Sequence, residues 1–291
     1  MSKTGKIFAL LMVFALLVSA LALGGCAKKD EGTGTTPPPA EKVGIKSVDD
    51  LKKGDKVAVQ SGTTGEGWAK ENLEPKGIVV VPYDDVLLAF SALQAGDVLG
   101  VINDLPISQD VVKDQTRGLE IVQEITTNEA YGFAFSKKNT VLRDSVNWAL
   151  AEVIKDGSYN TIYAKWFGSE PMSMPKAVSG ITAKPAGELK TLTAGKIILG
   201  SDTAYPPFEN VEGGATVGFD VDLMAAIAAK LGLTSEFKSY KFDALITGVQ
   251  AGSEFDMVAS AMTITDERKQ SIDFSDPYIN SNQSLAVKKA Q

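Results

Sequence analysis

Histidine is absent from the 291-residue chain, and cysteine occurs only once, at Cys26. Without histidine, neither a Ser-His-Asp triad nor a Cys-His pair can form, and the most common zinc ligand is missing. A single cysteine also excludes an intrachain disulfide bond. We therefore expect no metal centre, no cofactor and no enzyme of these classes.

Positively charged residues are in the minority, because 29 Lys and Arg stand against 36 Asp and Glu, which gives a formal net charge of −7. A protein that binds nucleic acid needs a basic face, so we expect no nucleic-acid partner. Hydrophobic residues make up 44% of the chain and charged residues 22%. This composition supplies a packed core, and the length suits one or two domains.

The first 43 residues differ in composition from the rest. Lys3 and Lys6 precede an apolar run over residues 7–23, and Leu-Gly-Gly leads directly to Cys26. Small residues before a lone cysteine resemble the lipobox of a bacterial lipoprotein signal. This resemblance implies that residues 1–25 are removed, which changes the net charge to −9, and that the Cys26 thiol is acylated and holds the protein at the outer face of the membrane. Residues 26–43, rich in Pro, Gly and Thr, then form a flexible tether. The alternative is a plain transmembrane anchor, since the apolar run approaches spanning length.

Beyond the tether, predicted strands and helices alternate in two blocks. The first block has strands at 57–60, 78–81, 98–102 and 119–122, with helices at 65–73, at 86–94 and from Pro106. The second has strands at 197–202, 235–238 and 255–259, with helices at 221–231 and 242–250. Alternation of this kind predicts α/β architecture, with mainly parallel sheets flanked by helices.

The two blocks share an internal plan. Residues 83–102 and 240–258 both run from a tyrosine through an apolar helix and Gln-Ala-Gly into an apolar strand. We therefore predict two lobes, with a ligand cleft at the carboxyl ends of their strands. The predicted lobes are residues 44–131 and 132–288. The second comprises a helical tail at 140–167, a linker at 168–195 and an α/β core at 196–288.

Residues 259–278 carry the most informative motif. An apolar strand leads through Thr263 and Thr265 into a short charged helix that contains Arg268. The start of a capped helix offers free N–H groups to an anion, and the planar guanidinium of arginine suits a carboxylate held by two parallel bonds. The alternative places Arg268 on the surface of a solvated charged helix.

The order Thr-Ile-Thr-Asp-Glu-Arg followed by Asp-Phe-Ser-Asp-Pro-Tyr resembles the signature of the polar amino-acid-binding proteins of ABC importers, the type II periplasmic receptors of solute-binding protein family 3. The resemblance covers residues 44–288 in two pieces and implies a two-lobed periplasmic-binding-protein-like fold. In the family, the block like residues 196–288 comes first. The swapped order resembles a circular permutation, which nearby termini permit. It implies that one interlobe strand, near 131–136, stays covalent, while the other ends free and is held by pairing.

The same resemblance assigns the groups that bind an amino acid's two charged ends. Thr263 and Arg268 are expected at the α-carboxylate, beside Thr63 and Thr64, and Gln60 lines the wall of the cleft. Asp104 is expected at the α-ammonium, together with the Ala261 carbonyl and the Thr263 hydroxyl. From the sequence alone, Asp104 could equally cap the helix that begins near Pro106.

The ligand's side chain is expected among Asp202, Tyr205 and Phe242. The two aromatic rings would flank the side chain, and the Asp202 carboxylate would disfavour an acidic ligand and favour a cationic one. By spacing alone, Phe242 is instead a core residue of an amphipathic helix. We expect arginine, followed by lysine, histidine or glutamine.

The sequence therefore predicts a monomeric, lipid-anchored receptor that captures a free amino acid and delivers it to an ABC permease. Two alternatives stay open. One is a dehydratase-like enzyme on the same scaffold, in which a cleft carboxylate acts as a general acid. The other is the ligand-binding domain of a signalling receptor.

Overall fold

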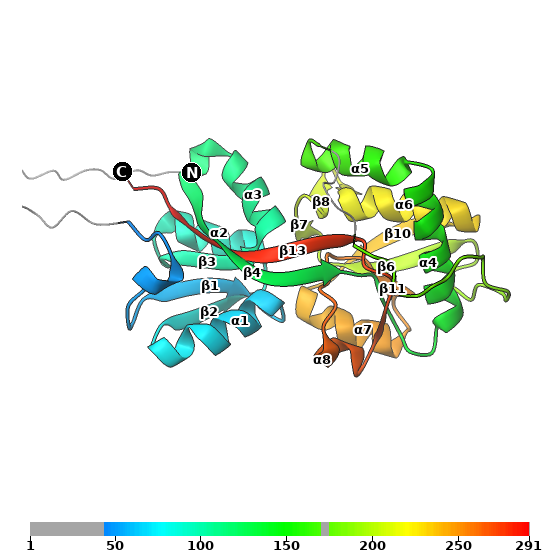
Figure 1. The fold of residues 1–291 in the computed structure, drawn as a ribbon, viewed down its shortest axis with the longest axis horizontal. Coiled ribbons are helices and arrows are strands. Elements are labelled where there is room, and N and C mark those ends of the chain that lie inside the picture. Colours follow the sequence, from blue (N-terminus) through cyan, green and yellow to red (C-terminus); the bar gives the residue numbers. More distant parts are fainter. Residues whose placement is uncertain (1–43, 170–174, 291) are drawn as a thin grey trace, which may run out of the picture. The chain divides into compact units, whose positions relative to one another are not determined.

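The computed structural model describes residues 44–169 and 175–290 (Figure 1). The predicted signal peptide, the acylation site at Cys26 and the tether lie outside the described residues. Among the residues that are described, no helix combines the length and the apolar character needed to span a bilayer.

The first sheet has five strands in the order β2-β1-β3-β13-β4. The strands β1, β2 and β3 are parallel, whereas β13 is antiparallel to both of its neighbours. The strand bounds are β1 Lys56–Gln60, β2 Val79–Tyr83, β3 Gly100–Asp104, β4 Leu119–Tyr131 and β13 Ile279–Lys288. The helices of this part are α1 Thr64–Asn72, α2 Val86–Ala95 and α3 Leu105–Lys113, with short 3₁₀ turns at Val48–Asp50, Glu74–Lys76 and Gln115–Arg117.

The second sheet also has five strands, in the order β10-β6-β11-β5-β12, and a three-stranded sheet β7-β8-β9 lies apart from it. The strand bounds are β5 Ala134–Phe135, β6 Lys196–Ser201, β7 Ala204–Tyr205, β8 Glu209–Glu212, β9 Ala215–Val217, β10 Thr234–Ser239, β11 Met257–Val258 and β12 Asp273–Phe274. The helices are α4 Thr140–Lys155, α5 Ser158–Phe167, α6 Phe219–Leu231, α7 Leu245–Ala251 and α8 Asp266–Lys269, with a 3₁₀ turn at Phe242–Ala244.

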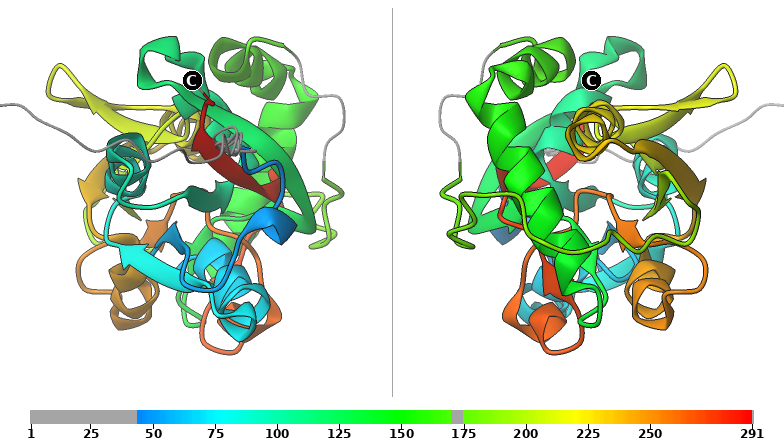
Figure 2. Two further views of the ribbon diagram at one scale, coloured as in Figure 1. Left: turned by 90° about the vertical axis from the view of Figure 1, so that its left-hand side faces the viewer. Right: turned by 90° about the vertical axis from the view of Figure 1, so that its right-hand side faces the viewer.

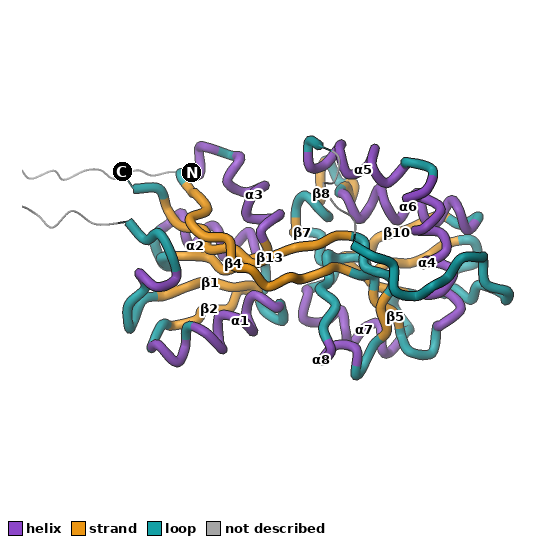
Figure 3. The backbone as a smooth tube through the Cα atoms, viewed as in Figure 1, coloured by secondary structure: helices purple, strands orange, loops and turns teal. Residues whose placement is uncertain are grey.

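Strand β13 corrects one predicted boundary. Residues 279–288 were expected to belong to the lobe of 132–288, yet β13 lies in the first sheet between β3 and β4. Figures 1 and 3 show β13 running beside β4 along the connection between the two five-stranded sheets. The physical reason is burial: Leu285, Ala286 and Val287 enter the core there, and pairing on both sides satisfies the backbone of the strand.

Two strands differ most in length from the prediction. β4 covers 13 residues, because it pairs with β13 as far as Tyr131. β11 is reduced to Met257–Val258. The side chain of Asp256 explains the shorter strand, since its carboxylate accepts the N–H groups of Ile198 and Leu192 at 2.8 and 2.7 Å.

The tail helices α4 and α5 pack on α6, as the right-hand view of Figure 2 shows for the long green helix α4 and the yellow helix α6. Gly218 sits at the start of α6 with φ +148°, and a Cβ there would lie 2.0 Å from the Phe208 carbonyl oxygen. Only glycine therefore allows this close approach of helix and loop. The run Gly-Phe-Asp-Val-Asp opens α6, with Asp220 and Asp222 in the first turn of the helix.

Candidate functional site

The predicted site residues come together where the carboxyl ends of strands from the two five-stranded sheets face each other. Gln60 ends β1, Asp104 ends β3, and Asp202 directly follows β6. Eight of the ten predicted residues are buried, namely Gln60, Asp104, Asp202, Tyr205, Phe242, Ala261, Thr263 and Arg268, whereas Thr63 and Thr64 are half-buried. The packing thus brings residues from both blocks of the sequence into one polar cluster.

Arg268 makes bonds to both blocks. Its Nη1 donates to the Thr263 carbonyl at 2.8 Å, and its Nη2 donates to the Gly62 carbonyl in the loop after β1 at 2.9 Å. The side chain is 9% exposed, and burial lowers the pKa of its guanidinium. The alternative of a surface arginine on a solvated helix is therefore wrong. Two of the five guanidinium donors hold carbonyls, so the group can donate further bonds to an anion.

Phe242 combines the two roles proposed from the sequence. It packs in an apolar cluster with Leu245 and Met262, and its ring lies 5.4 Å from Arg268 Cζ. The ring therefore serves the core and also covers the guanidinium, a contact that adds a cation–π interaction of about 0.5–2 kcal/mol.

The two adjacent threonines have different surroundings. Thr63 caps α1: its hydroxyl accepts the Glu66 N–H at 3.2 Å and donates to the Gln60 carbonyl at 2.7 Å. The Thr64 hydroxyl instead donates to Glu129 Oε2 at 2.7 Å. The hydroxyl of Thr63 is thus engaged within its own loop, and its carbonyl accepts the Gly67 N–H at 3.2 Å.

Asp104 does not cap α3 with its side chain, so the capping alternative is wrong. Tyr131 donates its hydroxyl to Asp104 Oδ2, and Gln283 Nε2 donates to Asp104 Oδ1 at 2.5 Å. Burial, and next the negative charge of Glu129, raise the pKa of Asp104 from 3.8 to about 7. A cation placed here would restore the ionised form.

Ala261 adopts φ +42°, in the left-handed region that residues with a Cβ rarely occupy. Its N–H donates to Asp220 Oδ2 at 3.0 Å, and Asp220 also accepts the Tyr278 hydroxyl at 2.9 Å. These bonds hold the strained turn between β11 and Thr263. Strain of this kind persists where the surrounding structure enforces it, often at ligand sites.

Asp202 lies on the other wall of the cluster. Gln60 Nε2 donates to its Oδ2 at 2.6 Å. Burial, followed by repulsion from Asp85, raises the pKa of Asp202 to about 6 although the Gln60 bond opposes the shift. Tyr205 is close by and donates its hydroxyl to Asn103 Oδ1 at 3.3 Å.

Three residues of the cluster escaped the sequence analysis: Tyr131, Glu129 and Gln283. All three lie on β4 or β13, the antiparallel pair that connects the two five-stranded sheets. The available signal was the polar pattern of β13, in which Ser281 and Gln283 precede a buried apolar run.

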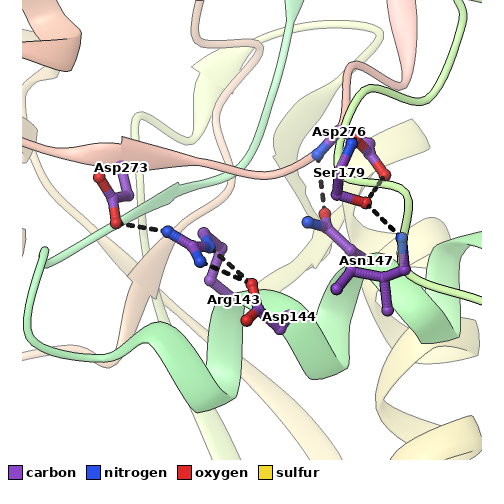
Figure 4. Close-up of polar contacts among 7 residues, drawn as sticks. Arg143, Asp144, Asn147, Ser179, Asp273 and Asp276 are labelled. Carbon is purple, nitrogen blue, oxygen red and sulfur yellow. Dashed lines mark hydrogen bonds and ion pairs between the residues drawn. The ribbon is translucent and has the colours of Figure 1, made fainter. Parts of the chain in front are cut away.

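A separate cavity of about 710 Å³ lies between α4, the loop at 178–181 and residues 273–277. Figure 4 shows polar contacts among the residues that line it. It contains none of the predicted site residues. Arg143 pairs there with Asp144 and Asp273 at 2.7 and 2.6 Å. Asp276 accepts the N–H groups of Val178 and Ser179 and donates its own N–H to Asn147 Oδ1. The Asp276 contacts therefore hold the loop at 178–181 against the segment after β12, and Arg143 joins α4 to β12.

The family model described as bacterial extracellular solute-binding proteins, family 3, matches residues 29–169 and 197–291. The arginine-binding extracellular protein ArtP of Bacillus subtilis (strain 168) is 44% identical over 94 residues, which cover 32% of this chain and 36% of ArtP. The L-cystine-binding protein TcyJ of Escherichia coli (strain K12) is 36% identical over 126 residues, or 43% of this chain and 46% of TcyJ.

Among solved structures, the arginine-bound form of domain 1 from TmArgBP is 39% identical, with 33% of this chain and 81% of that chain covered and a TM-score of 0.29. The chain spans between about a third and a half of the length of the two curated relatives described above.

Proposed function

Because the chain belongs to the bacterial extracellular solute-binding proteins, family 3, we propose that it is an extracytoplasmic receptor that captures one free amino acid and delivers it to an ABC permease. The observation that carries this proposal is the buried cluster in which Arg268, on α8, and Asp104, at the end of β3, come from different lobes. One supplies a cation for a carboxylate, and the other supplies an anion for an ammonium group.

In the proposed mechanism, the ligand's α-carboxylate accepts from the Arg268 guanidinium and from the hydroxyls of Thr64 and Thr263. Its α-ammonium donates to Asp104 and to the Ala261 carbonyl. Each end of the zwitterion is thus bound mainly by a different lobe, so only the closed arrangement satisfies both ends. Ligand binding therefore shifts the population toward closure.

Asp202 supports a cationic ligand side chain. A guanidinium or ammonium group at this position would replace Gln60 as partner of the Asp202 carboxylate and would favour its ionised form. We propose arginine first, then lysine, histidine or glutamine. An arginine-binding relative and a relative named as a probable histidine-binding protein support a cationic ligand, and a third relative is named for L-cystine.

The remaining sequence predictions extend the same proposal. We propose cleavage before Cys26, acylation of its thiol and anchoring of a monomer to the membrane. We also propose that the chain is a circular permutation of its family, with residues 44–131 and 279–288 forming one lobe and residues 132–278 the other. The pairing of β13 with β3 and β4 supports this division.

A thermal-shift screen tests the proposed function. The protein without residues 1–25 is heated with each of the twenty standard amino acids at 1 mM, and a ligand that binds only the folded state raises the unfolding midpoint. We expect arginine to give the largest shift. Absence of a shift with every amino acid would contradict the proposal, and a shift with aspartate or glutamate alone would contradict the role of Asp202.

A further inference from the structure

A carboxylate of the chain itself holds the two hydroxyls that the proposed function assigns to the ligand's carboxylate. Glu129 Oε2 accepts from Thr64 Oγ1 at 2.7 Å and from Thr263 Oγ1 at 2.6 Å. Thr64 begins α1, beside the first sheet, whereas Thr263 follows β11 of the second sheet. A single carboxylate oxygen therefore links groups of both lobes, which is the contact expected of a bound amino acid.

Gln283 supplies a matching donor. Its Nε2 donates to Asp104 Oδ1 at 2.5 Å and to Glu129 Oε1 at 2.9 Å. The Gln283 amide thus donates an N–H to Asp104, the residue to which the ligand's ammonium would donate in the proposed function. Gln283 is fully buried, and its Oε1 has no hydrogen-bond partner among the described residues.

The backbone is shaped to present these two side chains. Asn128 has φ +53°, and the register of β4 against β13 shifts between Ser281 and Gln283. The Asn282 side chain stabilises this bulge, because its Oδ1 accepts the N–H groups of Thr127 and Asn128 at 3.0 and 2.9 Å. A bulge redirects the side chain that follows it, here Glu129.

Gly65 provides the space for the amide. A Cβ at this position would lie 2.8 Å from Gln283 Oε1, so a larger residue would push the amide away from Asp104. Both the bulge and the glycine therefore favour the observed placement of the Glu129–Gln283 pair.

We infer that Glu129 and Gln283 form an internal placeholder, whose carboxylate and amide stand where the amino acid's carboxylate and ammonium bind, and which the amino acid displaces. This inference rests on the proposed function. A groove of about 420 Å³ lined by Thr64, Glu129 and Thr263 gives the ligand access to the placeholder. Because Glu129 lies on β4 and Gln283 on β13, their displacement acts directly on the two connections between the sheets.

The placeholder also defines the class of ligand. A ligand that displaces the placeholder must replace the hydrogen bonds that the placeholder makes, because a buried polar group without a partner costs free energy. The ligand must therefore offer a carboxylate to the Thr64 and Thr263 hydroxyls and an ammonium group to Asp104. Free α-amino acids meet both conditions. Amino-acid amides and N-acetylated amino acids each lack one group and are therefore excluded.

Removal of the competing carboxylate tests the inference. Glu129→Ala and Glu129→Gln are titrated with L-arginine by calorimetry, beside the unchanged protein and the control Glu120→Gln at the far end of β4. We expect Glu129→Ala to bind at least about tenfold more tightly, because the ligand no longer breaks hydrogen bonds to a charged group. The affinity of Glu129→Gln for arginine should lie between those of Glu129→Ala and the unchanged protein. The affinity of Glu120→Gln should equal that of the unchanged protein. Equal or weaker binding by Glu129→Ala would overturn the inference.

A second measurement separates this inference from the proposed function. Small-angle scattering without any amino acid should give a larger radius of gyration for Glu129→Ala than for the unchanged protein. The carboxylate that links Thr64 to Thr263 is then lost, and fewer bonds, among them Arg268 to Gly62 and Gln60 to Asp202, still join the lobes. Identical scattering curves would overturn the placeholder even if arginine binds. Failure of all twenty amino acids to bind the unchanged protein and Glu129→Ala would instead overturn the proposed function, whatever the scattering shows.

Discussion

Gln60 and Asp202 lie 142 positions apart in the sequence, yet Gln60 Nε2 donates a 2.6 Å hydrogen bond to Asp202 Oδ2. Each residue stands at or just after the carboxyl end of a strand, β1 in one sheet and β6 in the other. The bond thus joins the two lobes and partners a buried carboxylate whose pKa is raised to about 6. It also marks the place where a cationic ligand side chain would compete with a neutral amide.

Asp202→Asn should therefore discriminate between ligands. It removes the negative charge while it keeps the size of the side chain, so we expect arginine to lose roughly 1.5–3 kcal/mol of binding free energy and glutamine to lose less than 1 kcal/mol. Calorimetry with both amino acids measures the difference. Asp266→Asn serves as the control, because the Asp266 side chain is 98% exposed. Equal losses for arginine and glutamine would show that the ligand's side chain does not reach Asp202.

Arg268→Ala should weaken binding of any α-amino acid by roughly 3–5 kcal/mol, because it leaves a buried carboxylate without its cation. Arg268→Lys should restore little of the lost affinity. A lysine ammonium group cannot replace the planar guanidinium, which also donates to the Thr263 and Gly62 carbonyls. The neighbouring exposed Lys269→Ala is the matched control. Near-normal affinity of Arg268→Ala in calorimetry would remove the carboxylate clamp from the mechanism.

Much of this arrangement follows from local sequence patterns. The alternation of strands and helices predicted the α/β architecture, and the Thr-to-Arg motif led to the buried Arg268. The first prediction depends on spacing within short segments, where periodicity and capping act directly. The second depends on the resemblance of the motif to a known family. The position of Phe242 was harder to predict, because its ring both packs in the core and covers the Arg268 guanidinium.

The contacts that escaped prediction are those made between distant strands. Glu129 and Gln283 lie 154 positions apart, and their hydrogen bond depends on the register of β4 against β13. A polar residue in a strand carries no local sign of its partner, and a shift by one residue would reverse the face of each side chain. The boundary at residue 278 was missed for the same reason, because only pairing reveals that β13 belongs to the first sheet.

Cys26→Ala should release the protein from membranes. The prediction follows from the small residues before Cys26 and from the polar stretch after it, and stable anchoring requires acyl chains that each bury many methylene groups. Cell fractionation with detection of the protein measures the change, and mass spectrometry of the N-terminal peptide identifies the acylated thiol. Ser47→Ala, which keeps Cys26 intact, is the control and should remain with the membrane. Retention of Cys26→Ala in the membrane fraction would favour a spanning anchor instead.

The buried carboxylates make stability depend on pH. Burial raises the pKa of Asp104 and of Asp220 from 3.8 to about 7, and that of Asp202 to about 6. In the unfolded chain these groups titrate near their ordinary values, so between pH 5 and 7 the folded state binds more protons. The contribution of each group is fully present below the unfolded pKa and is lost as the pH rises through the folded pKa.

We therefore expect the free energy of unfolding to fall as the pH rises from 5 to 8, with Asp104 alone contributing on the order of 2 kcal/mol. Urea titrations at fixed pH values, without amino acid, measure the slope. Asp104→Asn should make the slope less steep, because the amide does not titrate whereas Asp220 and Asp202 still do. Asp114→Asn should leave it unchanged, since hydrogen bonds from Thr116 lower the pKa of that exposed carboxyl and keep it ionised throughout this range. A stability that rises with pH over the same interval would mean that Asp104 is ionised in the folded protein without any bound cation.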